Sequence, residues 1–230
     1  NTTMTAAEFA DKLAYAQANS NTTAEQLGEA YKNSAANLNA AGQDVETVTS
    51  LLAAMANQGL KGSEAGTALS AMMRDLTKSM DDGKIMIGDT AVAVQDANGD
   101  YRDLTDILAD VQAATEGMGD AERAAALGST FTADSIKGLN LILNDGVDKA
   151  ADFEEGLRDC DGAAGDMAKT MNDNVAGSLK LLKSNIESKM IRVFNAAKGS
   201  IKDSIDSMSS ALDTLDWEAI GEGVGTFAEK

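Results

Sequence analysis

The residues of this chain that could most readily take part in catalysis are its carboxylates. The chain has 37 acidic residues and 19 basic ones. Pairs of such groups can catalyse glycoside hydrolysis as acid and base. Those pairs work in clefts with aromatic platforms for the sugar, and only 4% of this chain is aromatic. The chain has no histidine, which excludes Ser-His-Asp and Cys-His catalysis and histidine-based metal sites. We therefore interpret the acids as solvated helix faces and the protein as not an enzyme.

Two acidic segments could instead bind a cation. Residues 96–100 (DANGD) begin like an EF-hand loop, but the glycine is fourth instead of sixth, and Ile107 stands in place of the final glutamate. We interpret this segment as a turn. The second segment carries acids that spread around a predicted helix: Asp145, Asp148, Asp152, Glu154, Glu155, Asp159 and Asp161. Neither pattern predicts a metal site, and no cofactor is expected.

The last chemical candidates are a lone cysteine and a glycine-rich segment. Cys160 has no histidine to activate it, and it cannot form an internal disulfide. Residues 59–67 (GLKGSEAGT) match neither the G-x-G-x-x-G nor the Walker A pattern, so we interpret them as a helix end, a turn and an N-cap at Ser63. Gly66 is expected to allow a neighbouring backbone to approach closely. We assign no catalytic, cofactor-binding or metal-ligating residue.

The charge of the chain limits its partners. A net charge of −18 argues against general nucleic-acid binding, which needs lysine and arginine for phosphate contacts. Residues 176–202 differ, with six basic residues against the single acid Glu187. They are either a solvated helix face or a surface for an acidic partner. No stretch approaches 18 uninterrupted apolar residues, so no membrane span is predicted.

The elements that must position these residues are predicted to be mainly helices. Proline is absent, and alanine, leucine, methionine, glutamate and lysine favour helix. Capping boxes at Thr5–Glu8 and Thr22–Glu25 open the first two helices. Met72 and Met73 are assigned to the core. The predicted helices span residues 6–18, 24–40, 44–59, 63–80, 103–115, 120–127, 133–144 and 147–158.

The hydrophobic period changes to two between residues 81 and 101. Ile85 and Ile87, then Val92 and Val94, alternate with smaller or polar residues, and residues 96–99 (DANG) supply a tight turn. We therefore predict a small β-hairpin near residues 84–101. It is inserted in a compact helical domain that covers residues 1–160.

A single apolar stripe follows this domain. Its steps of three or four residues average about 3.7, close to the helical period, and its members are Met167, Met171, Val175, Leu179, Leu182, Ile186, Met190, Val193, Ala197, Ile201, Ile205, Met208, Leu212 and Leu215. The stripe predicts a long amphipathic helix or helical hairpin over residues 161–216, with bends at Gly177 or Gly199 and a flexible end at 217–230. Parallel copies could bury the stripe against one another.

Four segments in this order resemble the core region of phage tail tape measure proteins. They are residues 59–73 (GLKGSEAGTALSAMM), 91–107 (AVAVQDANGDYRDLTDI), 127–141 (LGSTFTADSIKGLNL) and 162–186 (GAAGDMAKTMNDNVAGSLKLLKSNI). The third departs from the usual phenylalanine-then-glycine order of the family. The likeness covers most of residues 1–200. The family core carries no catalytic residues, so none is transferred.

The resemblance implies a structural protein of a phage, prophage or phage-tail-like particle. Such a protein occupies the tail tube lumen, sets the tube length and is released on genome ejection. Implied partners are the tail tube protein, distal tail or baseplate proteins and tail assembly chaperones, in the virion tail and, during assembly, the host cytoplasm. The chain starts at Asn1 without an initiator methionine or signal peptide, so a fragment of a longer protein is expected. The alternatives are a bacterial helical stalk or signalling protein and a membrane-active protein.

Overall fold

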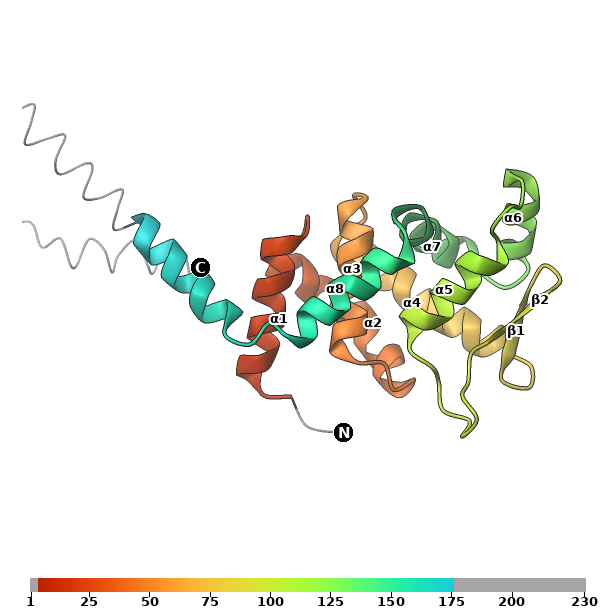
Figure 1. Ribbon diagram of the computed structural model, residues 1–230, viewed down its shortest axis with the longest axis horizontal. Helices are drawn as coiled ribbons and strands as arrows, with labels where there is room; N and C mark the ends of the chain where they lie inside the picture. Colours follow the sequence, from red (N-terminus) through yellow and green to blue (C-terminus); the bar gives the residue numbers. More distant parts are fainter. Residues whose placement is uncertain (1–3, 176–230) are drawn as a thin grey trace, which may run out of the picture. The chain divides into compact units, whose positions relative to one another are not determined.

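The computed structural model describes residues 4–175 and is mainly helical with one small antiparallel hairpin, which confirms the predicted fold class (Figure 1). The elements are α1 (Ala6–Asn19), α2 (Ala24–Ala40), α3 (Val45–Asn57), α4 (Gly62–Ser79), β1 (Lys84–Ile87), β2 (Thr90–Ala93), α5 (Leu104–Ala114), α6 (Asp120–Gly128), α7 (Ala133–Asp145) and α8 (Val147–Arg158). The chain divides into two units, residues 1–165 and 166–230.

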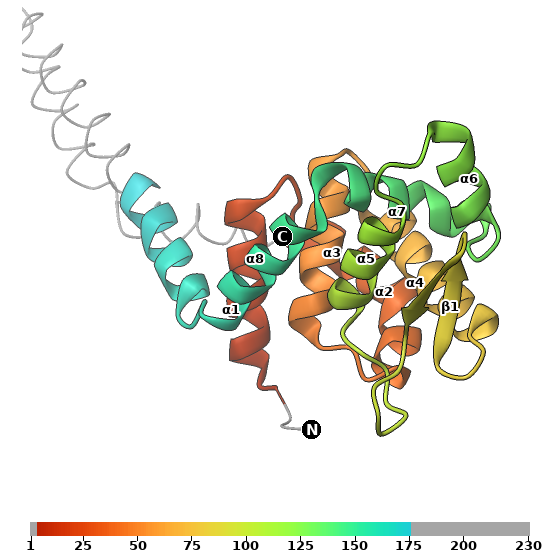
Figure 2. The same ribbon diagram turned by 45° about the vertical axis from the view of Figure 1, so that its right-hand side comes forward.

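Helix α3 is the centre of the first unit. It packs against α1, α2, α4, α5, α7 and α8, and every residue from 47 to 56 is buried. In both views α1 lies at one end of this unit and the hairpin lies with α6 at the other (Figures 1 and 2). A helix buried on all sides must satisfy its own polar groups. Accordingly, Thr49 and Ser50 donate to the α3 carbonyl oxygens of Val45 and Thr47.

Helices α2 and α4 approach each other closely at Gly66. A Cβ atom added to Gly66 would lie 2.1 Å from the carbonyl oxygen of Ala30. The prediction that Gly66 admits a neighbouring backbone is therefore confirmed. The core role of Met72 and Met73 is also confirmed, since their exposed fractions are 0% and 2%.

Helix ends follow local sequence signals, with two corrections. Thr5 and Glu8 form the predicted capping box, but the second box pairs Thr23 with Gln26, one residue later than predicted. Helix α3 ends at Asn57, and Gly59, with φ 93°, follows the C-cap residue as the predicted stop. There Leu60 N donates to the Met55 carbonyl oxygen at 3.0 Å.

The predicted N-cap of α4 is wrong. The helix begins at Gly62 with Lys61 as its N-cap. The Ser63 hydroxyl therefore lies inside the first turn, and it accepts a hydrogen bond from Asn33 Nδ2 at 2.7 Å. The Ser63 side chain, which the sequence pattern assigned to capping, thus contacts Asn33 of α2 instead.

Two turns follow one another between residues 84 and 101, one within the hairpin and one after it. β1 and β2 pair in the register Ile85↔Val92, joined by a two-residue turn in which Gly88 has φ 60°. The predicted turn at residues 96–99 lies beyond β2, where an isolated bridge joins Gln95 to Tyr101. The buried face carries Ile85, Ile87 and Val92, in agreement with the period of two.

The long apolar stripe is described only at its start. Residues 163–175 are helical, and the rest of the predicted helix and its bends lie outside the described residues, as do residues 217–230. Over the part of the chain that is described, no helix combines the length and apolar character needed to cross a membrane.

Candidate interaction sites

The segment at residues 96–100, which begins like an EF-hand loop, is a turn organised by Asp96. Its Oδ1 accepts hydrogen bonds from Asn98 N at 2.8 Å and Asp100 N at 3.0 Å. These backbone donors lower the pKa of Asp96 below its ordinary value. The carboxylate therefore organises its own loop.

The acids between residues 145 and 161 do not converge on one point. Asp145 pairs with Lys149 at 3.2 Å on the surface, whereas Glu154 points into the core. Within residues 4–175 no group of three or more carboxylates, thiols or imidazoles is placed to hold a metal ion. Cys160 is buried and donates to the Leu157 carbonyl oxygen, and burial raises the pKa of its thiol.

Glu154 is the centre of a buried polar cluster that sequence reasoning missed. Its Oε2 accepts from Thr105 Oγ1 at 2.9 Å. Thr47 Oγ1 shares its one proton between Glu154 Oε1 at 3.1 Å and Asp103 Oδ2 at 2.7 Å. Arg158 Nη2 completes the set at 2.6 Å. The cluster joins α3, α5 and α8. A signal was present, because Glu154 interrupts the otherwise apolar face of α8 formed by Val147, Ala150 and Leu157.

Replacing Glu154 with glutamine is expected to destabilise the protein by about 2–3 kcal/mol, because the amide removes the charge and offers a donor where hydroxyl donors converge. Urea unfolding of the full chain measures the effect. The control is Glu155→Gln, which changes the exposed neighbouring residue of the same helix. Equal unfolding midpoints for the two variants would contradict a structural role for the cluster.

A second cluster fastens α1 to the end of α8. Lys12 Nζ donates to the Leu157 carbonyl oxygen at 3.0 Å and pairs with Glu46 at 2.8 Å. The adjacent Asp11 accepts from the backbone nitrogens of Gly162 and Ala164 at 3.0 and 2.9 Å. These two donors lower the pKa of Asp11. The pair Asp11–Lys12 thus contacts a carbonyl in the last turn of α8 and the backbone N–H groups of residues 162 and 164.

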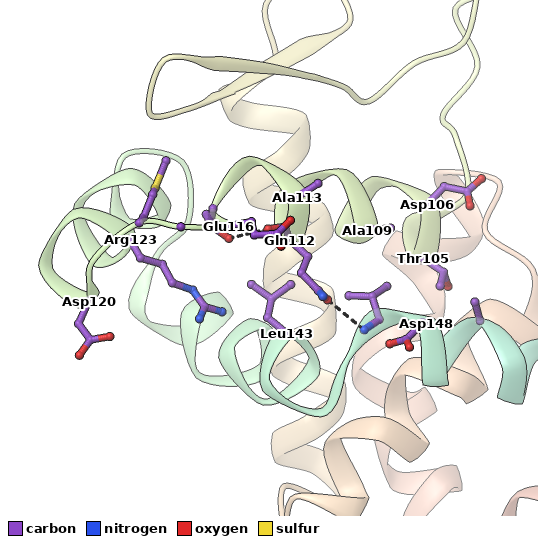
Figure 3. A pocket seen from close by; sticks show the side chains of 15 residues that line it. Thr105, Asp106, Ala109, Gln112, Ala113, Glu116, Asp120, Arg123, Leu143 and Asp148 are labelled. Carbon is purple, nitrogen blue, oxygen red and sulfur yellow. Dashed lines mark hydrogen bonds between the residues drawn. The ribbon is translucent and has the colours of Figure 1, made fainter.

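A hollow of about 600 Å³ lies between α5, the loop after it and the α7–α8 junction (Figure 3). Arg123 extends toward it from α6, and across it Gln112 accepts a hydrogen bond from Val147 N at 3.1 Å. Arg123 Nε is buried without a hydrogen-bond partner among the described residues. Four carboxylates share the lining with this one cation: Asp106, Glu116, Asp120 and Asp148. The hollow is therefore electronegative and does not favour an anion.

A second hollow, which we term the α2–α4 groove, has a volume of about 580 Å³. Its lining combines apolar side chains with two cations and a tyrosine: Ala40, Ala41, Met73, Arg74, Lys78 and Tyr101. Tyr101 donates to Thr77 Oγ1 at 3.0 Å and so fixes one wall. In a chain of net charge −18, this groove combines apolar surface with positive charge.

The stripe proposed for self-association is described at three positions. Met171 and Val175 are exposed at 52% and 38%, and Met167 is half-buried. The remaining stripe residues and the basic stretch 176–202 lie outside the described residues.

Comparisons with known proteins identify relatives. The chain matches the family described as phage-related minor tail protein over residues 1–132. It is also 28% identical over 210 residues to a tape measure protein of Pneumococcus phage Dp-1, which covers 91% of this chain. The chain spans 18% of the length of that relative. No solved structure matches the chain.

Proposed function

Because this chain belongs to the family of phage-related minor tail proteins, we propose that it is part of a tail tape measure protein. In this proposal the parent protein occupies the lumen of the tail tube, sets the number of tube rings and leaves on genome ejection. The observation that carries the proposal is the likeness to a tape measure protein along almost the whole chain. A bacterial stalk or a membrane-active protein is not favoured, because both matches are to phage tail proteins.

The proposed mechanism of length determination depends on continuous helix. A helix converts residue number into distance at about 1.5 Å per residue. The chain contains no proline, and the apolar stripe of residues 167–215 keeps a helical period. We propose that parallel copies bury this stripe against one another and that the tail tube protein, distal tail or baseplate proteins and assembly chaperones are their partners. The role is structural, without an enzymatic step in this part of the parent.

Deleting residues 176–215 from the parent gene is expected to shorten the tails by roughly 60 Å, at about 1.5 Å per residue. Electron microscopy of the assembled particles measures the tail length. The control replaces the same residues with an unrelated helix-forming sequence of equal length, which is expected to restore it. Unchanged tails after the deletion would contradict the proposed ruler.

A further inference from the structure

The α2–α4 groove has the chemistry of a docking surface. Its floor is formed by Ala40, Ala41 and Met73, and Arg74 and Lys78 lie on one wall, one helical turn apart. Within the described residues, the one ion pair of Arg74 is a long contact with Asp75 at 3.6 Å. Lys78 makes no ion pair with any residue between 4 and 175. A suitable occupant therefore combines an apolar side chain with nearby acids.

The hairpin of the same unit presents such a feature. Met86 is exposed at 51%, and it is the one large hydrophobic side chain so exposed among residues 4–165. It lies on the outer face of β1, opposite Ala91 of β2. Acidic residues lie at both ends of the strand, Asp81 and Asp82 before it and Asp89 in the turn after it, all exposed. Lys84 reduces this negative charge but does not cancel it.

We propose that the hairpin around Met86 in one copy of this chain docks into the α2–α4 groove of a second copy. The two surfaces belong to one folded unit, in which Met86 is exposed and does not line the groove, so their contact requires two molecules. Met86 would lie against Ala40, the exposed apolar residue of the floor, and Asp89 would approach Lys78. The proposal rests on the proposed function, in which several copies lie together in one tail.

Because the hairpin and the groove are different surfaces, their contact is head-to-tail. Such contacts close into rings or continue as strings of molecules, depending on the rotation between copies. The contact is small compared with the roughly 800 Å² per partner of a stable complex, so we expect weak binding, on the order of 0.1 mM. It would become populated where copies are held together at high local concentration.

Cross-linking between differently tagged copies of the full chain tests this contact. In a Cys160→Ser background, Ala40→Cys marks the groove and Ala91→Cys marks the hairpin face beside Met86. A short bis-maleimide is expected to link the two copies in the mixture. The matched control replaces Ala91→Cys with Glu155→Cys, an exposed position on α8 that is not part of the hairpin.

Substitutions at exposed positions then test the chemistry. Met86→Ser in the hairpin copy, or Lys78→Glu in the groove copy, is expected to lower the yield about ten-fold. Asp89→Lys in the hairpin copy is expected to restore the yield with Lys78→Glu, because the ion pair is re-formed with reversed signs. Circular dichroism verifies that each variant is folded.

A cross-linking yield equal to that of the Glu155→Cys control would overturn the docking. A cross-linking yield that neither Met86→Ser nor Lys78→Glu changes would overturn it as well. Failure of this contact is distinguishable from failure of the proposed function. Tail lengths that follow the deletion of residues 176–215 without any cross-link would refute the docking and leave the ruler intact. Cross-linking with unchanged tail lengths would support the docking and refute the ruler.

Discussion

Gly66→Ala is expected to destabilise the folded unit by about 3 kcal/mol, at the upper end of overpacking costs. The new Cβ would lie 2.1 Å from the carbonyl oxygen and 2.7 Å from the carbonyl carbon of Ala30. Both atoms belong to the backbone of α2, so a side-chain rotation cannot relieve the overlap. The two helices must separate, and α2 and α4 form the most extensive helix pair of this unit.

Gly28→Ala is the matched control for this prediction. Gly28 lies in the interior of α2, and a Cβ there meets no atom within 4 Å. Alanine is favoured over glycine in a helix by about 1 kcal/mol, so this variant is expected to be neutral or more stable. Urea unfolding of both variants gives the comparison, and a Gly66→Ala variant as stable as Gly28→Ala would contradict the close helix approach.

Asp75→Asn is expected to cost about 3 kcal/mol, because the amide oxygen that replaces the buried carboxylate is uncharged and is therefore a weaker acceptor, and because the amide also buries an NH2 donor. Asp75 lies on α4 and is 2% exposed. Its Oδ2 accepts from Thr132 N at 2.8 Å, from Thr132 Oγ1 at 2.6 Å and from the Ser135 hydroxyl. Thr132 is the N-cap of α7 and makes no side-chain cap of its own. Asp75 therefore caps α7 from another helix.

The pH dependence of stability provides an independent check on Asp75. Burial alone would raise the pKa of this carboxyl, but the hydrogen bonds from Ser135 and Thr132 outweigh it, and the pKa lies below its ordinary value of 3.8. A lowered folded-state pKa contributes stability that is complete above pH 3.8 and is lost as the pH falls toward the folded-state pKa. The difference between wild type and Asp75→Asn is therefore expected to shrink below about pH 4.

Urea unfolding at a series of pH values measures this difference. The control is Asp152→Asn, which changes an exposed acid on α8 and is expected to leave stability within about 0.5 kcal/mol of wild type. A difference between wild type and Asp75→Asn that stays constant down to the acid transition would contradict the role assigned to the ionised carboxylate.

Most element boundaries were predictable because their signals are local. The capping box at Thr5, the glycine at residue 59 and the alternation through Ile85 and Ile87 act within a few residues, and the structure places helix or strand ends there. The two misplaced capping residues, Thr22 and Ser63, lie where neighbouring polar residues compete to cap. At Ser63 the competition is decided by Asn33 of α2, which the local pattern does not contain.

The buried polar clusters were not predictable because each joins residues distant in sequence. Lys12 and the Leu157 carbonyl are 145 residues apart, and Asp75 and Thr132 are 57 apart. A single sequence shows only one partner of such a contact, an acid on an apolar helix face. It does not show which distant residue binds that acid. Glu154 and Asp75 both carried that signal, since Asp75 adjoins Leu76 on the buried face of α4. The α2–α4 groove gave no comparable signal, because its walls come from three separate segments.

The Asp11–Lys12 contacts connect the beginning of the first unit to its end. They join its first helix, α1, to residues 157, 162 and 164 close to the end of the unit at residue 165. Tension applied through the two chain ends would therefore load these few bonds before it reached α3. The unit would unfold from these bonds, which we term the seam, toward its centre. Helix α1 would detach first and α3 would unfold last. Its resistance to pulling would be set by the lifetime of that seam instead of by the stability of its core.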